Sequence, residues 1–465
     1  MIWLILVLGL VLRVVNLDQG LWLDEGTQAL LSNKSLYSIF FERSADFHPP
    51  LSYLLLHYWM MLGGSEIWLR LLSVFFGIAT IAVTYQLAKK LFDQNIAIIS
   101  ALFLAVAPYH IYYSQEVRMY SEAAFFATLS MYFFIRVIEK NNFRFKLWYI
   151  ISSLFLIYTL YPGIFLLFSQ LLFVFFKQKE KLASFLKQNV LIGLFYLPWI
   201  PQLILQLKSG IGADEYLPGW GGILSLSTAK VFPLTFLKFS IGRINFENDY
   251  IYGLVAIIVV TIFGYLLFIG VRSLKKNQLL IVFWLAVPFI LAFITSLKIP
   301  LNQPFRLLFL LPAFYILLAT GVNNKGKFRK VALISVLLVS LGGLGAYYFN
   351  PSFWRENWRG GTKFINENCN NCSAIFVWSE PFAPFQWYKG TSGVGIVKKF
   401  PADINEINMN MKNISGRKEI YLFEYLQDLS DPGRLTQKWL DQNGYKRVDI
   451  LEFNGVGFIY KYVKG

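Results

Sequence analysis

Long apolar segments recur along this chain, and they constrain its fold more than any other feature of the sequence. A helix needs about 20 apolar residues to cross the hydrocarbon core of a bilayer. With 56% hydrophobic and only 15% charged residues, the chain could not bury these segments in a soluble domain. We therefore expect an all-α polytopic membrane domain of about 11 transmembrane helices, near 1–17, 67–88, 94–111, 118–138, 147–162, 164–177, 186–206, 251–272, 278–297, 304–322 and 331–349.

The two short segments at 147–162 and 164–177 meet at Tyr161-Pro162-Gly163, which favours a tight helical hairpin. Met1–Leu17 could also be a secretory signal peptide. It lacks a basic region before the apolar run and a small-residue cleavage site after it, so a retained first span is favoured.

The net charge of +16 at first suggests a nucleic-acid partner. With the N-terminus inside, however, five turns between the predicted spans face the cytoplasm, and they hold 17 Lys and Arg but 3 Asp and Glu. The other residues of 1–350 hold 11 basic and 12 acidic side chains. Such a bias is typical of membrane topology, so we expect no nucleic-acid partner, and only Arg13 is a mild exception. The turns are 89–93, 136–146, 177–187, 272–276 and 323–330.

The composition changes near residue 350 and predicts two domains, 1–350 in the membrane and 351–465 outside it. The second part has no segment long enough to span, and an odd number of spans places it on the extracytoplasmic face. Helix-like stretches near 357–367 and 433–443 alternate with β-rich runs, which indicates a small α/β domain. The β-rich runs are 374–378, 419–426, 448–453 and 456–463, and Asn454-Gly455 predicts a hairpin between the last two.

Cys369 and Cys372 are the only cysteines, and their C-x2-C spacing leaves their state open. A zinc site would need two further ligands nearby, and the three histidines lie far away in the sequence. A short external disulfide and two unpaired thiols are both consistent with this spacing.

Two long loops are expected on the external side. The first, 18–66, contains Asp24-Glu25 and a proline-led apolar stretch at 49–62, which predicts an amphipathic helix on the membrane surface because it is too short to cross. The second, 207–250, carries Asp214-Glu215 and Arg243.

Unusual polar residues gather at the predicted external ends of the spans. Taken singly, each would most often be an interfacial anchor. Together they form an acidic centre surrounded by arginines, and charge at that depth is costly unless it serves a function. The residues are Asp24, Glu25, His48, Glu66, Arg70, Glu116, Arg118, Tyr120 and Arg306.

This set of side chains suits displacement at a sugar anomeric carbon with a phosphate leaving group. A carboxylate can take the proton of an acceptor hydroxyl, and arginines can neutralise the departing phosphate through paired hydrogen bonds. Aromatic rings can flank a sugar or a prenyl tail. Glu116 and Tyr120 would share one helix face if the helix begins there.

Four strings follow one another along the first part of the chain: W-L-D-E-G at 22–26, H-P-P-L-S-Y-L-L-L at 48–56, W-L-R-L-L-S at 68–73 and Y-S-Q-E-V-R-M-Y at 113–120. In this order they resemble the GT-C class of membrane glycosyltransferases, and most closely its family 39 and family 83 group. That group holds dolichyl-phosphate-mannose protein mannosyltransferases and bacterial lipid A aminoarabinose transferases. The run F-R-L-L-F-L-L-P at 305–312 also resembles the R-Y-x-L-P segment usual in such proteins.

The resemblance implies transfer of a sugar from a polyprenyl-phosphate donor to a lipid, glycan or protein acceptor on the external face of the cell membrane. It implies that Asp24 is the catalytic base and that Glu25 pairs with Arg70. The β-trefoil insertion of the eukaryotic protein mannosyltransferases is missing, and Leu307 stands where a tyrosine is usual. Some relatives use a divalent metal, but no ligand cluster in this sequence predicts one.

Two other functions are compatible with parts of the sequence. A ligase that moves a whole glycan from a lipid diphosphate would share the fold and the acid–arginine chemistry. A transporter would place its ionisable residues near the bilayer midplane and often shows inverted repeats. This chain has its acids near the span ends and no internal repeat, which favours the transferase.

Overall fold

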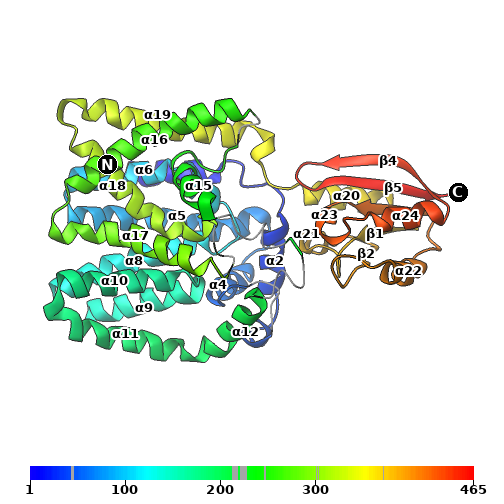
Figure 1. The fold of residues 1–465 in the computed structure, drawn as a ribbon, viewed down its shortest axis with the longest axis horizontal. Helices are drawn as coiled ribbons and strands as arrows, with labels where there is room; N and C mark the ends of the chain where they lie inside the picture. The colour runs from blue at the N-terminus through cyan, green and yellow to red at the C-terminus, as the bar shows by residue number, and fades with distance from the viewer. Residues whose placement is uncertain are drawn as a thin grey trace. The chain divides into compact units, whose positions relative to one another are not determined.

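The computed structural model describes residues 1–42, 47–211, 218–219, 228–245, 248–299, 301, 303–369 and 371–465 (Figure 1). The chain forms two compact units. The first comprises Met1–Leu17, Ser35–Leu207 and Ser225–Phe353, and the second comprises Asp18–Lys34, Lys208–Leu224 and Trp354–Gly465. The segment with Asp24 and Glu25 therefore belongs to the second unit.

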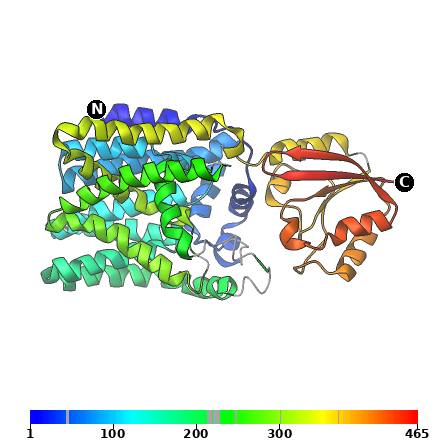
Figure 2. The same ribbon diagram turned by 45° about the horizontal axis from the view of Figure 1, so that its top comes forward.

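The first unit consists of helices, and its long helices run side by side along a common direction (Figures 1 and 2). The helices of this unit, long and short, are α1 (Ile2–Val14), α3 (Leu36–Phe41), α4 (Leu51–Met60), α5 (Glu66–Leu91), α6 (Gln94–Ala105), α7 (Pro108–Ser114), α8 (Tyr120–Glu139), α9 (Phe143–Thr159), α10 (Gly163–Lys177), α11 (Leu182–Tyr196), α12 (Ile200–Ile211), α15 (Thr228–Ile241), α16 (Asp249–Arg272), α17 (Leu280–Thr295), the 3-10 helix η4 (Pro304–Leu310), α18 (Leu311–Asn323) and α19 (Arg329–Phe349).

Each of the eleven predicted apolar segments lies in these helices, but the count of eleven spans is not confirmed. Among the described residues, seven helical stretches are long and apolar enough to cross a membrane, and α6 with α7 makes an eighth if the bent pair is one span. The two helices meet at an angle of 60°. The helices α1 and α10 are apolar but have 13 and 15 residues. Hydropathy alone does not reveal where an apolar run bends or stops.

Side-chain caps explain where several helices begin. Ser65 accepts a hydrogen bond from the amide of Trp68 at the start of α5, at 3.3 Å. Asp93 accepts two from the first turn of α6, at 2.7 and 3.0 Å. These residues are favourable N-caps, because their oxygens satisfy amides that have no partner inside the helix.

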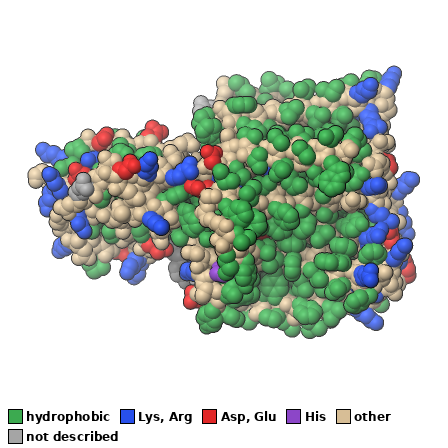
Figure 3. Space-filling model, turned by 180° about the vertical axis from the view of Figure 1, so that it is seen from behind, with side chains coloured by type: hydrophobic (Ala, Val, Ile, Leu, Met, Phe, Trp, Pro, Cys, Tyr) green, Lys and Arg blue, Asp and Glu red, His purple; other side chains and the backbone are tan. Residues whose placement is uncertain are grey.

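The surface of the helical unit is divided between apolar and basic regions. Hydrophobic side chains cover the flanks of the helices in Figure 3, and Lys and Arg side chains gather at one end of them. Five turns rich in Lys and Arg join α5 to α6, α8 to α9, α10 to α11, α16 to α17 and α18 to α19. This distribution agrees with a membrane protein whose basic turns share one side.

The second unit is built around a five-stranded mixed sheet, in the order β2-β1-β3-β5-β4. The strand β1 pairs in parallel with β2 and β3, whereas β5 is antiparallel to β3 and β4. The small α/β domain predicted from the sequence is confirmed. Its elements are α2 (Leu23–Ser32), α20 (Trp358–Asn368), β1 (Cys372–Phe376), α21 (Ala383–Trp387), β2 (Gly393–Gly395), α22 (Ile404–Lys412), β3 (Glu419–Phe423), α23 (Gln427–Ser430), α24 (Leu435–Gln442), β4 (Tyr445–Phe453) and β5 (Gly457–Lys464).

Apolar side chains cover both faces of this sheet, because the central strands alternate between two cores. Ile420 and Leu422 of β3 join a core with α22 and α24, and Tyr421 and Phe423 join another with α20 and α21. The strand β1 is buried over its whole length. Continuous burial of this kind is typical of a parallel strand covered on both faces.

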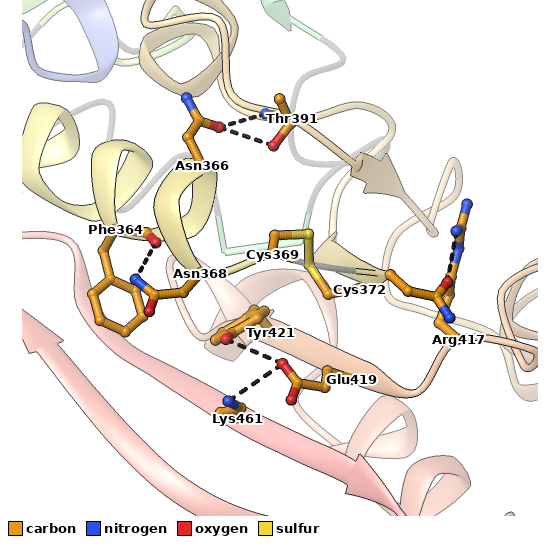
Figure 4. Close-up of a disulfide and its surroundings, with 11 residues drawn as sticks. Phe364, Asn366, Asn368, Cys369, Cys372, Thr391, Arg417, Glu419, Tyr421 and Lys461 are labelled. Carbon is orange, nitrogen blue, oxygen red and sulfur yellow. Dashed lines mark hydrogen bonds and ion pairs between the residues drawn. A yellow bond between two sulfur atoms is a disulfide. The ribbon is translucent and has the colours of Figure 1, made fainter.

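Two local features connect these elements. The predicted hairpin is confirmed, and Gly455 in its turn has φ +72°, which an L-residue rarely adopts. Cys369 and Cys372 form a disulfide between the end of α20 and the start of β1 (Figure 4). Nearby, the side chain of Asn366 binds Thr391 at 2.8 and 3.0 Å. Of the two states that the sequence left open, the disulfide is observed.

Candidate active site

The residues predicted to form the site fall on both units. Asp24 and Glu25 belong to the second unit, and the other seven predicted residues belong to the first. Asp214 and Glu215 lie outside the described residues. The seven residues of the first unit are His48, Glu66, Arg70, Glu116, Arg118, Tyr120 and Arg306.

Asp24 and Glu25 lie in the first turn of helix α2, which the sequence did not predict. Glu25 is fully buried, and its Oε2 accepts a hydrogen bond from the amide of Trp22 at 3.4 Å. The same oxygen lies 3.9 Å from the Arg355 guanidinium. Asp24 is only half-buried. The two acids therefore differ, since Glu25 stabilises the start of the helix and Asp24 is partly accessible.

Three residues of the C-terminal part fix the backbone of α2 and of the segment before it. The Leu23 amide donates to Glu356 Oε2 at 3.3 Å, and the Leu21 amide donates to the Tyr388 hydroxyl at 2.7 Å. Gly26 packs on the backbone of Pro384, where a Cβ added to the glycine would lie 2.8 Å from the proline nitrogen. This close approach explains the glycine of the W-L-D-E-G string.

Glu356 is an acid that the sequence analysis missed. It accepts hydrogen bonds from Trp358 Nε1 at 2.7 Å and from the Tyr425 hydroxyl at 2.9 Å, besides the Leu23 amide. Burial raises the pKa of its carboxyl group, the three donors oppose that rise, and the charge of Asp24 adds to it. The pKa of Tyr425 is raised by burial and then by Glu356 and Asp24. Asp24, Glu356 and Tyr425 thus form one cluster.

In the first unit, Arg70 lies near the start of α5 and is buried, with its Nη1 donating to the Leu17 carbonyl at 2.9 Å. The expected pairing of Arg70 with Glu25 stays a prediction. One turn further along α5, Ser73 binds the chain between α7 and α8. Its hydroxyl donates to the Glu116 carbonyl at 2.6 Å, and its carbonyl accepts from the Ser121 hydroxyl at 2.9 Å.

Glu116 and Arg118 lie in the turn between α7 and α8, and both are buried. The helix α8 begins only at Tyr120, so the helix face that Glu116 and Tyr120 were expected to share does not exist. Gln115 holds this turn, because its amide nitrogen donates to the carbonyls of Arg13 and Val15 at 3.0 and 2.6 Å. The turn is therefore fixed by contacts with the end of α1.

An aromatic cluster connects this turn to the start of η4. The Tyr113 ring lies 5.3 Å from the Tyr120 ring, which lies 5.1 Å from the Phe305 ring. Arg306 follows Phe305, and its guanidinium lies 5.7 Å from that ring. The structure thus brings Tyr120 and Arg306, which are far apart in the sequence, to one aromatic cluster.

Arg243 joins the same cluster from the loop after α15. Its Nη1 donates to the Tyr112 hydroxyl at 2.6 Å, and its guanidinium lies 5.1 Å from the Tyr112 ring. The Tyr112 ring in turn lies 5.1 Å from that of Tyr113. Arg243 therefore contacts the aromatic cluster through both a hydrogen bond and its guanidinium plane.

The remaining expectations concern His48, Leu307 and metal binding. His48 is half-buried and precedes α4, whose first residue is Leu51, so the prolines lie before the helix and not within it. Leu307 is buried in η4. In the part of the chain that the structure describes, no three His, Cys, Asp or Glu side chains are grouped to hold a metal ion.

The bend between α6 and α7 is filled by Arg13 of α1. The guanidinium of Arg13 donates to the carbonyls of Leu104 and Ala105 at 3.3 and 3.1 Å, and it lies 2.6 Å from His110 Nδ1. Carbonyls at the end of a helix have no partner within it, so this buried arginine satisfies them. Arg13, an exception to the charge bias, therefore has a structural role.

Comparison with known proteins supports the resemblance inferred from the sequence. Residues 47–204 match the family model for dolichyl-phosphate-mannose-protein mannosyltransferase. No curated protein matches the chain by sequence. The region matched by the family model includes the H-P-P-L-S, W-L-R-L-L-S and Y-S-Q-E-V-R-M-Y strings.

Solved structures of two glycosyltransferases share the fold of the whole chain. The crystal structure of ArnT from Cupriavidus metallidurans in the apo state matches this chain at 14% sequence identity and a TM-score of 0.63. The match covers 99% of this chain and 97% of the ArnT chain. The same protein bound to undecaprenyl phosphate gives a TM-score of 0.62, with the same identity and coverage.

The archaeal oligosaccharyltransferase AglB from Archaeoglobus fulgidus has been solved in complex with an inhibitory peptide and a dolichol-phosphate. It matches this chain at 12% sequence identity and a TM-score of 0.58, over 99% of this chain and 74% of the AglB chain. These proteins belong to the GT-C class, so the predicted fold class is confirmed.

Proposed function

We propose that this protein is an integral membrane glycosyltransferase that moves a hexosyl or pentosyl unit from a polyprenyl-phosphate donor to a lipid, glycan or protein acceptor. The observation that carries the proposal is the fold shared with ArnT over nearly the whole length of both chains. ArnT has been solved with undecaprenyl phosphate, and the family model concerns a dolichyl-phosphate-dependent enzyme. Both names point to a sugar donor on a lipid phosphate.

In the proposed reaction, Asp24 takes the proton of an acceptor hydroxyl. The acceptor oxygen then bonds to the anomeric carbon while the bond between that carbon and the phosphate oxygen breaks. The electron pair leaves with the polyprenyl phosphate, which regains its full charge. Half-burial of Asp24 supports this role, because a base has to reach its substrate, whereas the fully buried Glu25 supports the helix that carries it.

We assign the donor phosphate to arginines of the first unit. Arg118 lies in the turn before α8, and Arg306 and Arg243 lie at the aromatic cluster of Tyr112, Tyr113, Tyr120 and Phe305. Their planar guanidinium groups suit a phosphate through directed pairs of hydrogen bonds. The aromatic rings offer flat surfaces for a sugar or for the first isoprene units of the tail.

The proposed location is the cell membrane, with the reaction on the extracytoplasmic face. The Lys and Arg side chains at one end of the helical unit support a cytoplasmic position for that end (Figure 3). The disulfide between Cys369 and Cys372 supports an oxidising compartment for the second unit.

A reconstituted transfer assay tests the function. Purified protein in vesicles is given a synthetic undecaprenyl-phosphate sugar, and the lipids are analysed by mass spectrometry. We expect release of undecaprenyl phosphate with the wild type and a loss of about 100-fold or more with Asp24→Asn, because the amide keeps the shape but cannot accept the proton. Activity within about threefold of wild type, less than 1 kcal/mol, would exclude Asp24 as the base.

A glycan ligase remains the second candidate, because AglB, an oligosaccharyltransferase, shares the fold. A ligase would use a lipid diphosphate and would leave the polyprenyl-phosphate monosaccharide untouched. Mass spectrometry of lipids and surface glycans from cells with and without the protein distinguishes the two candidates and identifies the acceptor.

A further inference from the structure

The first turn of α2 is held by an acid that lies far away in the sequence. Glu356 Oε2 accepts the amide of Leu23, the residue just before Asp24, at 3.3 Å. The amides of a first helical turn have no partner inside the helix, so this bond fixes the position from which Asp24 extends. Glu25 secures the preceding amide, that of Trp22. Asp24 thus lies in a turn that two other carboxylates hold.

Burial raises the pKa of Glu356, and three hydrogen-bond donors oppose that rise by stabilising its charged form. Its two oxygens accept from three donors, namely the Leu23 amide, Trp358 Nε1 and the Tyr425 hydroxyl, at 3.3, 2.7 and 2.9 Å. An ionised carboxylate only accepts hydrogen bonds, and bonds to a charged acceptor are stronger than neutral ones. This arrangement holds one fixed negative charge at the start of α2.

The charges of Glu356 and Asp24 act on each other. The charge of Asp24 contributes to raising the pKa of Glu356. Such coupling is reciprocal, so the charge of Glu356 also raises the affinity of Asp24 for a proton. A general base with a higher proton affinity is a more effective proton acceptor.

We propose that Glu356 is a positioning residue for Asp24, because it fixes the first turn of α2 and places a carboxylate beside that turn. This inference rests on the proposed function, in which Asp24 takes the proton of the acceptor. It also gives the C-terminal part of the chain a role in the reaction, since that part supplies Glu356, Trp358 and Tyr425.

The titratable and charged groups around Asp24 and Glu356 determine how the transfer rate changes with pH. Tyr425 binds Glu356 at 2.9 Å and is influenced by the charge of Asp24. Arg355 lies beside Glu25, and Arg359 lies beside Gly20 in the segment before α2. The arginines keep their charge at any working pH. The acid limb of the rate profile therefore reports protonation of the coupled acids.

Glu356→Gln tests the proposal, because glutamine keeps the size and hydrogen-bonding capacity and removes the charge. The oxygen of Gln can accept from Leu23 and Trp358, and its amide can donate to the Tyr425 oxygen. As pH falls, Asp24 gains a proton and transfer stops. Without the second charge Asp24 gains its proton at lower pH, so we expect the acid limb of kcat/KM to move down by about half a pH unit or more. The maximal rate should fall about threefold or more, because the base is weaker.

Asp431→Asn is the matched control. Asp431 is also a buried acid of the second unit, and it accepts the amides of Leu435 and Thr436 in the first turn of α24 at 2.8 and 2.9 Å. We expect this variant to keep the wild-type position of the acid limb. Glu356→Asp retains the charge, so the acid limb should stay near its wild-type position. Its shorter side chain moves the carboxylate away from the Leu23 amide, so the rate should still fall. A wild-type rate would contradict the positioning role, and this variant carries the test if Glu356→Gln does not fold.

The outcomes separate this inference from the proposed function. Suppose that the wild type transfers sugar and Asp24→Asn does not. If Glu356→Gln then keeps the acid limb of the wild type, or lowers the rate equally at every pH, the positioning role is wrong. If Asp431→Asn moves the limb as far as Glu356→Gln does, the charge effect is not specific, and the role is again wrong. If Asp24→Asn transfers sugar normally, the proposed base is wrong and this inference fails with it.

Discussion

Gly26→Ala should displace the helix that carries Asp24. An added Cβ would lie 2.8 Å from the nitrogen of Pro384 and 3.0 Å from its Cα and Cγ. Ordinary carbon contacts lie at about 3.5–4.0 Å, so α2 or α21 has to move by roughly half an ångström to one ångström. The obstacle is backbone and a rigid ring, which cannot rotate aside as a long side chain can.

The magnitude of the effect results from two opposing terms. Alanine is the better helix former by up to about 1 kcal/mol. Overpacking in a rigid contact costs about 1–3 kcal/mol. We therefore expect a net destabilisation of up to about 2 kcal/mol, which is the difference between these terms. The rate should suffer more, since a shift of about 1 Å at a reacting group can cost about 100-fold.

The assay is kcat/KM for release of undecaprenyl phosphate, measured together with the thermal unfolding of the purified protein. Gly416→Ala is the control, because a Cβ there meets nothing within 4 Å. We expect a loss of at least about tenfold for Gly26→Ala and wild-type behaviour for Gly416→Ala. Equal activity and stability of the two variants would refute the packing argument.

Two further predictions concern charged residues. Glu25→Gln and Arg355→Ala should be coupled by about 1 kcal/mol or more in a double-mutant cycle of unfolding, because the loss of either side chain leaves a buried charge without its partner. Strictly additive effects on the free energy of unfolding would exclude the pair. Arg118→Lys and Arg306→Lys should weaken apparent donor affinity, because lysine lacks the planar fork, whereas Arg272→Lys at the basic end of α16 should not. Unchanged affinity in both of the first two variants would leave Arg243 as the next candidate for the phosphate.

The helical part of the fold could be predicted because its signal is local. Each apolar run identified from hydropathy lies in one helix or in consecutive helices, and Asn454-Gly455 forms the expected hairpin. Helix ends were less predictable. The bend after Ala105 and the late start of α8 at Tyr120 depend on partners such as Arg13 and Ser73, which lie elsewhere in the sequence. Apolar periodicity carries no information about such contacts.

The candidate site was predicted only in part for the same reason. The W-L-D-E-G string identified Asp24 and Glu25, but it gave no sign of a helix, because Trp22 is not a usual N-cap residue. The acid that holds this helix, Glu356, follows Leu23 by 333 residues. Arg243 was noticed only as a loop residue, and its contact with Tyr112 required the folded chain.

The buried contact of Arg13 has a consequence for how the protein is made. The helix α1 is synthesised before α6, so it exists before the carbonyls of Leu104 and Ala105 do. Until then, the arginine near the end of α1 has to remain hydrated at the interface, because an unpaired guanidinium is costly in lipid. Only when α6 and α7 emerge from the ribosome can the side chain move inward and complete their bend. Final seating of the first helix is thus a late event of biogenesis, coupled to the arrival of the third predicted span.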